Sequence, residues 1–158
     1  MNKDKIREFT MRVSNANKSD MVVILYDIAI TYIGDAKKAL AKGDKPTFRL
    51  EVGHIRNTVK ELMDSVNTGT DIGLNLMRLY VFCNGELTRA FMDYSEEPLN
   101  HVYNTLSKLR EGYAEVSRQD TSEPVMVNAE RVYAGYTYNR NLMNENISAM
   151  EGNRGILA

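Results

Sequence analysis

The chain has 158 residues, of which 43% are hydrophobic and 26% are charged, a composition that suits one soluble domain with its own core. With 20 basic and 21 acidic residues the net charge is −1, so nucleic acid is not a favoured partner, because nonspecific phosphate binding needs a concentrated positive field. The single cysteine, Cys83, excludes an intramolecular disulfide and a multi-cysteine zinc site.

Residues 1–16 are predicted to form an N-terminal arm. Its first residues, MNKDKIREF, are charged and do not form a signal peptide. Further on, Phe9, Met11 and Val13 alternate with polar residues, and Ile6 precedes them. This pattern suits an extended segment that lies across an apolar groove as a cap, and a frayed terminus is the alternative.

The segment 17–40 is predicted to form a long helix with more apolar surface than one core-facing stripe requires. Asn17 and Asp20 suit a capping box at its start, and Gly43 suits a helix end. One stripe contains Met21, Leu25, Ile28, Tyr32, Ala36 and Leu40, and a second contains Val22, Tyr26, Ala29 and Ile33. A helix that is apolar on two sides is either wrapped by neighbours or has a surface for a partner.

Three more helices are predicted, and the short connections between them favour antiparallel neighbours. The first starts near Asp44 and ends before Asn67. The next starts near Asp71 and again carries apolar residues beyond one face. The last follows Pro98 and fades near Arg118. The expected fold is all-α, an antiparallel up-down four-helix bundle over residues 17–118 with an N-terminal arm and a C-terminal extension.

The C-terminal extension covers residues 119–158. It begins with the linker-like run DTSEP and continues into an asparagine-rich sequence without sustained periodicity, so most of it is expected to be disordered or to become ordered on binding. A further hypothesis places four apolar residues in a groove of this chain or of a second copy: Val132, Tyr133, Tyr136 and Leu142.

Catalytic and metal motifs are weak in this sequence. Glu51 and His54 have the Glu-x-x-His spacing of di-iron bundles, but the only other histidine, His101, has Pro98 three residues before it. Cys83 falls in an apolar helical period with no histidine nearby in sequence, which favours a core position over a nucleophile. We therefore expect no enzyme activity, no metal, no catalytic residue and no cofactor; a metal-dependent bundle enzyme is the least favoured alternative.

Several segments resemble the flagellar secretion chaperones of the FliS family. They occur in the family's order and with compatible spacing: Val13 to Asp20, Leu25-Tyr26-Asp27, Val59 to Asn67, Asn75-Leu76 with Leu79-Tyr80, and Leu106 with Leu109-Arg110. The chain departs from the family where Lys18 replaces the cap proline. It departs again where Lys5 and Glu8 occupy the places of the arm tyrosines.

The resemblance implies a cytosolic chaperone that binds the disordered C-terminal region of flagellin. Such a chaperone prevents premature polymerisation and assists delivery to the flagellar type III export gate proteins. No run of the sequence reaches membrane-spanning length, so no membrane insertion is expected. A homodimer is a further candidate, and the alternative function is a structural bundle that homo-oligomerises through its apolar surface.

Surplus apolar surface on the first and third predicted bundle helices is the expected flagellin-binding groove. Its predicted residues are Val22, Tyr26, Ile33, Leu74, Met77, Tyr80 and Val81. The stripe that contains Met21 and Ile28 is assigned to the core instead. Tyr26 and Tyr80 also suit the core, where a ring packs inside and its hydroxyl finds a partner. The predicted cap over the groove consists of Ile6, Phe9, Met11 and Val13.

Overall fold

The computed structural model describes residues 1–126, and all the regular structure in this part of the chain is helical. The prediction of an all-α fold is confirmed over these residues. The helices are α1 (Lys3–Ser14), α2 (Lys18–Ala41), α3 (Lys45–Asp64), α4 (Asp71–Asp93) and α5 (Glu97–Gln119). The helix bounds predicted between residues 17 and 119 lie within a few residues of these.

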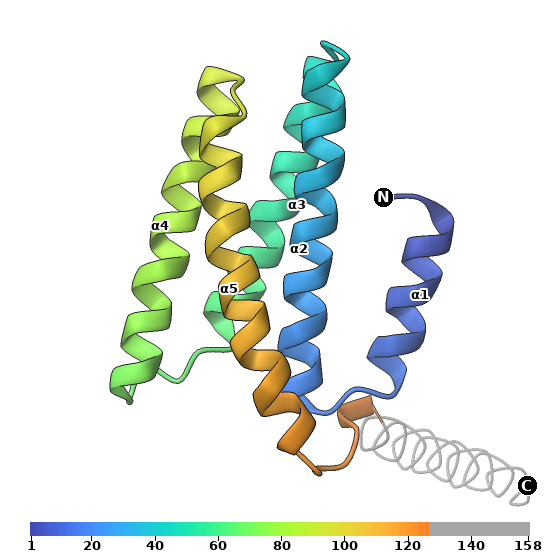
Figure 1. Cartoon of the computed structure of the whole chain (residues 1–158), viewed down its shortest axis with the longest axis vertical. Coiled ribbons are helices and arrows are strands. Elements are labelled where there is room, and N and C mark those ends of the chain that lie inside the picture. The colour runs from blue at the N-terminus through green and yellow to red at the C-terminus, as the bar shows by residue number, and fades with distance from the viewer. Residues whose placement is uncertain (127–158) are drawn as a thin grey trace, which may run out of the picture.

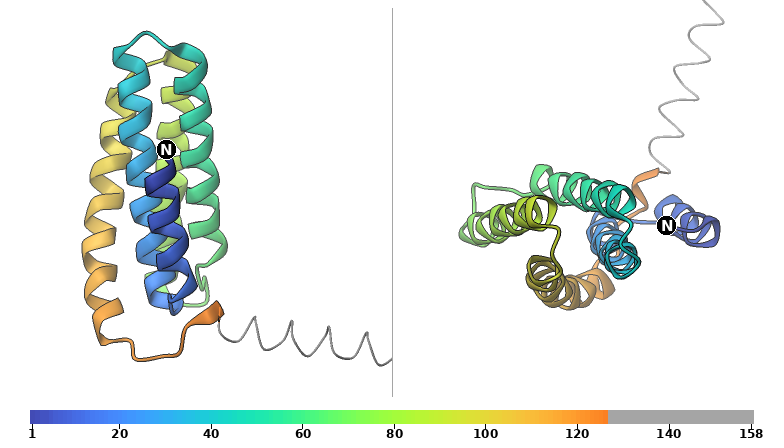
Figure 2. Two further views of the ribbon diagram at one scale, coloured as in Figure 1. Left: turned by 90° about the vertical axis from the view of Figure 1, so that its right-hand side faces the viewer. Right: turned by 90° about the horizontal axis from the view of Figure 1, so that it is seen from above.

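Helices α2 to α5 run side by side, and each runs opposite to the one before it (Figure 1). Helix α2 packs against α3 and α5, and α4 packs against the same two helices. Seen from above, α2 to α5 surround one core, while α1 lies outside them next to α2 (Figure 2). We call the interior shared by α2 to α5 the main core.

The helix ends follow the predicted chemistry. The Asn17 side chain accepts a hydrogen bond from the Asp20 amide, and the Asp20 side chain accepts one from the Asn17 amide, so the capping box is present. After α2, Gly43 has a φ of +68°, a conformation that costs glycine little. Thr70 caps α4 by accepting a hydrogen bond from the Gly73 amide.

The main core is continuous and closely covered. It combines three alanines, Tyr26 and Ile33 on α2 with mostly larger aliphatic and aromatic residues on α3 to α5. Its fully enclosed large side chains are Tyr26, Tyr80, Phe48, Ile33, Ile55, Leu62, Leu87, Leu99, Leu106, Val52, Val59 and Val102. Each aliphatic side chain removed from water in this way contributes about 1.5–3 kcal/mol before entropy is counted. The stability of the molecule therefore resides mainly in α2 to α5.

Two tyrosine hydroxyls meet inside the main core. Tyr26 on α2 and Tyr80 on α4 are hydrogen-bonded through their hydroxyl groups, and the ring of Tyr113 on α5 lies 5.7 Å from that of Tyr26. Burial raises the pKa of Tyr80 to about 12 and raises that of Tyr26 further. Both hydroxyls are thus neutral, so one donates and the other accepts, and neither is left unpaired in the core.

The prediction that the N-terminal arm is extended is wrong, because residues 3–14 form the helix α1. Ile6, Phe9 and Val13 have helical spacing and share one side of α1, while Met11 is 62% exposed on the other. The alternation of apolar and polar residues that suggested an extended arm included Met11, which does not face the bundle. Phe9 is only 6% exposed, so the arm docks on the protein and is not a frayed terminus.

Candidate functional site

Helix α1 sits on a second apolar face of α2, opposite the face that enters the main core. Phe9 and Ala16 are buried there against Ile24, and Val13, Met21 and Ile28 pack around them. We call this face of α2, with Met21, Ile24, Ile28 and Tyr32, the covered groove. The sequence assigned Met21 and Ile28 to the core, but they lie under α1 instead.

The fit between α1 and the covered groove is incomplete. An open surface hollow of about 310 Å³ lies along the seam between them, lined by Met1, Ile6, Phe9, Thr10, Val13, Ile28 and Tyr32. Ile6 leans over this hollow but is 52% exposed. Side chains along such an open seam contact solvent on one side, so they make fewer dispersion contacts than side chains enclosed in the main core. The docking of α1 is therefore weaker than the packing within the main core.

Polar contacts tie the last turn of α1 to the bundle through Asp27. Arg12 on α1 lies 2.7 Å from one carboxylate oxygen of Asp27, and Arg110 on α5 donates to the other at 2.9 Å. This carboxylate therefore joins α1, α2 and α5. Asp27 and Arg110 belong to two of the segments that resemble the FliS family, and their pairing gives a structural reason for the spacing between those segments.

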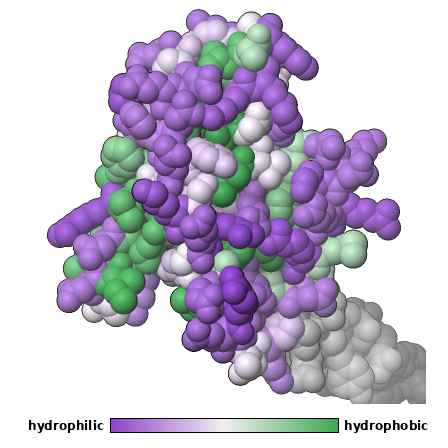
Figure 3. All heavy atoms as spheres, in the orientation of Figure 1, coloured by the Kyte–Doolittle hydropathy of each residue, from purple (hydrophilic) through white to green (hydrophobic). Residues whose placement is uncertain are grey.

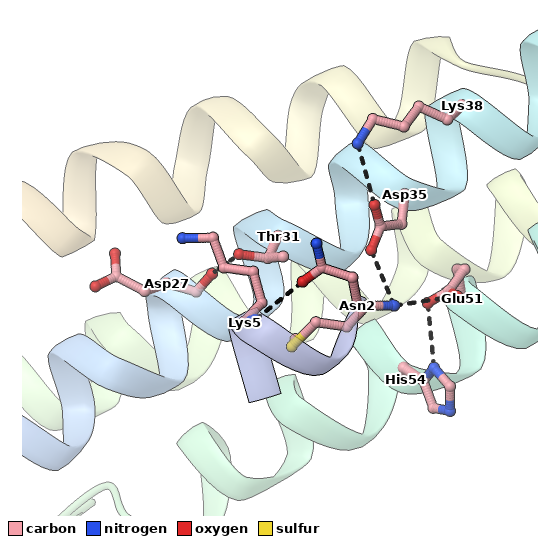
Figure 4. Close-up of polar contacts among 9 residues, drawn as sticks. Asn2, Lys5, Asp27, Thr31, Asp35, Lys38, Glu51 and His54 are labelled. Carbon is pink, nitrogen blue, oxygen red and sulfur yellow. Dashed lines mark hydrogen bonds and ion pairs between the residues drawn. The ribbon is translucent and has the colours of Figure 1, made fainter. Parts of the chain in front are cut away.

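A second polar cluster holds the start of α1, where Asn2 caps the helix by accepting a hydrogen bond from the Lys5 amide (Figure 4). The Met1 amino group lies 3.0 Å from Asp35 on α2 and 3.9 Å from Glu51 on α3. Burial opposes ionisation of Asp35, but hydrogen bonds from Met1 and Lys38 outweigh it and lower the pKa of this carboxyl. The start of α1 is thus held by charge and its middle by Phe9.

The second candidate surface is the outward side of α4, where large apolar side chains point into solvent. The most exposed of them are Ile72, Leu74, Leu79, Val81, Phe82 and Met92. We call these six residues the α4 face. Hydrophobic atoms gather over α4 at the left of the space-filling view (Figure 3). Exposed apolar surface of this kind is typical of an interaction site.

The α4 face continues into a groove at one end of the bundle. Val22 of α2, Ile72 and Leu76 of α4, and Tyr113 of α5 line a hollow of about 300 Å³ there, together with the α3–α4 connection. Tyr113 stands between this groove and the main core, since its ring also packs beside Tyr26. An apolar segment bound along α4 would have a deeper seat at this end.

The predicted groove residues divide into two groups. Tyr26, Ile33 and Tyr80 are at most 1% exposed in the main core, so the prediction that they line an open groove is corrected. Tyr26 and Ile33 lie on the side of α2 that faces α3 to α5, whereas the opposite side of α2 contacts α1. Val22 lines the groove at the end of the bundle, Leu74 and Val81 are exposed, and Met77 is half-buried near them.

The predicted cap residues also divide. Phe9 and Val13 contact the covered groove, Ile6 borders its hollow, and Met11 faces away from it. Ile24, which is 3% exposed beneath α1, was not predicted to belong to this interface. The helical spacing of Ile6, Phe9 and Val13 was the available signal, because it indicates a helix that needs an apolar partner face. The hypothesis for Val132, Tyr133, Tyr136 and Leu142 lies outside the described residues.

The residues considered for metal binding or nucleophilic chemistry have other roles. His54 is hydrogen-bonded to Glu51 at 3.2 Å, and its ring packs tilted against that of Tyr32, with the ring centroids 4.7 Å apart. Cys83 is buried, and burial raises the pKa of its thiol to about 11. Within residues 1–126, no three His, Cys, Asp or Glu side chains gather so that they could hold a metal ion. No helix of this part of the chain is both long and apolar enough to cross a membrane.

Comparison with known proteins connects this arrangement to one family. A family model described as "Flagellar protein FliS" matches residues 1–120, which include α1 to α5. No curated protein matches the chain. The matched region contains the covered groove, the α4 face and the Arg12–Asp27–Arg110 contacts.

Proposed function

The chain belongs to the flagellar protein FliS family, and from this membership we propose that it is a cytosolic export chaperone for flagellin. In this proposal it is an antiparallel up-down four-helix bundle with a detachable arm and a C-terminal extension. It binds the disordered C-terminal region of flagellin, prevents premature polymerisation, and assists delivery to the flagellar type III export gate. It performs no catalysis and uses no cofactor.

The observation that best supports this proposal is the loose cover on α2. The covered groove is apolar, yet α1 fills it with one well-buried large side chain, Phe9, and leaves a hollow. Twelve-residue helices such as α1 are marginal in water on their own. Once displaced, α1 is therefore only partly helical, and the apolar surface that it covered becomes available to an amphipathic client helix.

The α4 face supplies the second part of the client site. A flagellin terminus must hide the apolar side that it later buries in the filament, and Leu74 and Val81 offer matching surface without any rearrangement. Burying apolar area recovers roughly 25 cal/mol per Å², offset by the entropy lost when the client becomes ordered. A disordered client can bind along the α4 face and into the groove at the end of the bundle that Val22 and Tyr113 line.

The alternative function is a structural bundle that homo-oligomerises through the same surface. The exposure of six large apolar residues on the α4 face is the observation that favours it. The alternative assigns no role to the loose fit of α1, so the chaperone function explains more of the structure. A homodimer that dissociates when the client binds is compatible with the proposal.

Size-exclusion chromatography of the full chain, with and without a flagellin C-terminal peptide, tests the proposal. A chaperone forms a stoichiometric complex with the peptide and loses any self-association. A structural oligomer elutes at the same volume in both runs, and that result would reject the chaperone function.

A matched pair of variants locates the binding surface in the same assay. Leu74→Ser changes the α4 face, and Leu50→Ser removes an equally large side chain that is 58% exposed on α3. Leu74→Ser is expected to weaken peptide binding about tenfold, corresponding to the loss of one apolar contact. Leu50→Ser is expected to leave it unchanged. Equal effects of the two variants would show that the α4 face has no special role.

A further inference from the structure

The segment that follows α5 turns back to the junction between α1 and α2. Residues 120–125, which we call the strap, leave the end of α5 at Asp120 and reach Ala16 at Val125. Figure 1 shows this segment, in orange, below the lower ends of α1 and α2. The family match ends at residue 120, so nearly all of the strap lies beyond it.

Specific hydrogen bonds hold the strap to the junction. The Val125 amide donates to the Ala16 carbonyl at 2.9 Å. Asn17 donates its side-chain amide to the Asp120 carbonyl at 3.1 Å, and the Ser19 hydroxyl donates to the Asp120 carboxylate at 2.5 Å. These partners are separated by about a hundred residues in sequence, so the contacts close the chain on itself.

The end of α5 adds to the same attachment. The Ser117 hydroxyl donates to the Asp20 carboxylate, which also accepts from the Asn17 amide. Hydrogen bonds from Ser19 and from Ser122 lower the pKa of Asp120 to about 2, so this carboxylate is charged at neutral pH. The strap therefore meets the capping box of α2 directly.

The junction is the place where α1 would have to pivot. Asn15 ends α1 in a non-helical conformation, Ala16 is 2% exposed, and Asn17 begins the cap of α2. Any movement of α1 away from α2 changes the backbone dihedrals of these residues. The strap fixes them, because it accepts from the Asn17 side chain and donates to the Ala16 carbonyl.

We infer that the strap is a latch that stabilises α1 in the covered groove, so that release of the strap favours exposure of the groove. A segment that binds only one of two conformations increases the population of that conformation by its differential binding free energy. The link to client binding rests on the proposed function, but the latch is a property of the chain alone and can be measured without any client.

Hydrogen exchange measured by mass spectrometry on the full chain tests the latch. Val125→Pro removes the amide that donates to Ala16, at an exposed position directly after Pro124. Val125→Ala keeps the amide and serves as the matched control. Asp120→Ala is an independent way to weaken the strap, because it removes the carboxylate that accepts from Ser19 and Ser122.

Val125→Pro and Asp120→Ala should each speed exchange in residues 3–14 by about three- to tenfold, the effect of one lost hydrogen bond. Val125→Ala should match the wild type, and α4 should exchange at an unchanged rate in all variants. Unchanged exchange of α1 in both Val125→Pro and Asp120→Ala would overturn the latch. Equal acceleration in α1 and α4 would overturn it too, because it would show general destabilisation. Neither result bears on flagellin binding, which the chromatography tests separately.

Discussion

The two sides of helix α2 differ in how they are covered. On one side, Tyr26 and Ile33 are sealed within the main core by three helices. On the other side, Ile24 and Ile28 are covered by α1 and the residues that flank it, and an open hollow of about 310 Å³ lies along this seam. Both sides are apolar, so hydrophobicity alone does not make an interface permanent. The number and fit of the covering elements decide whether a surface can be exposed again.

This difference separates two kinds of stability in one small molecule. Removal of α1 leaves the main core intact, because α1 packs mainly against α2 and contributes no side chain to that core. Opening α2 from α3 or α5 exposes the main core itself. We therefore expect α1 to open locally at a free-energy cost well below that of global unfolding. Substitutions in the main core, in α1 and in the strap test this separation.

Leu87→Ala tests the main core. Leu87 is completely buried on α4, and its truncation should lower the free energy of unfolding by about 2–5 kcal/mol, through lost burial and the cavity left behind. Denaturant unfolding followed by circular dichroism measures the change. A loss below about 1 kcal/mol would mean that the core collapses readily around the site, which contradicts the tight packing described.

Phe9→Ala tests the α1 interface. Truncating Phe9 should speed hydrogen exchange in residues 3–14 by about tenfold or more, since Phe9 is the principal side chain that holds α1. The free energy of global unfolding should fall by no more than the docking free energy that is lost, about 1.4 kcal/mol for a tenfold change, because the main core is untouched. Met11→Ala, on the exposed side of α1, is the control and should alter neither quantity. A Phe9→Ala effect on global unfolding as large as that of Leu87→Ala would show that α1 and the bundle form one cooperative unit.

Arg12→Ala tests the polar tie between α1 and Asp27. This contact is partly exposed, so its loss should weaken α1 docking by only about 0.2–1 kcal/mol. Hydrogen exchange in α1 at low ionic strength measures it, and added salt should reduce the difference between the variant and the wild type. Arg7→Ala, on the exposed side of α1, provides the comparison. Identical exchange in the two variants would show that the contact between Arg12 and Asp27 does not stabilise the docking of α1.

The pH dependence of the strap gives the smallest expected effect. The folded-state pKa of Asp120 is lowered to about 2, below the ordinary value of about 3.9. A lowered pKa means that the stabilisation is present above the ordinary value and is lost as the pH falls toward the folded value. Exchange in α1, corrected for its intrinsic pH dependence, should therefore rise slightly below about pH 4. Asp120→Asn should lack this rise; an identical rise in the variant would assign the effect to other groups.

Local signals predicted much of the fold. The caps formed by Asn17 and Asp20, the turn at Gly43 and the helical periods of α2 to α5 are encoded within a few residues, and the structure has them where they were expected. The helix in the arm was missed because Met11 was counted with Phe9 and Val13. Met11 is apolar although it is exposed, so Phe9, Met11 and Val13 together resembled the alternation of an extended segment.

The candidate site was harder to predict, because the two stripes of α2 are both apolar and local sequence does not say which one faces the core. Tyr26 can be buried without leaving its hydroxyl unpaired, because Tyr80, which is 54 positions away in the sequence, provides the hydrogen-bond partner. Ile24 is covered because Phe9 reaches it from α1. Both facts depend on tertiary packing. Leu74 and Val81 were predicted to be surface residues of α4 and are exposed, since surplus apolar residues on a helix can be recognised from its own sequence.

Hydrogen exchange of the full chain, measured with and without a saturating flagellin C-terminal peptide, shows whether the client displaces α1. If the peptide replaces α1 and binds along α4, residues 3–14 exchange faster in the complex while residues 72–92 exchange more slowly. If the complex forms and residues 3–14 keep or increase their protection, α1 is not a displaceable cover, and the proposed role of the covered groove is contradicted.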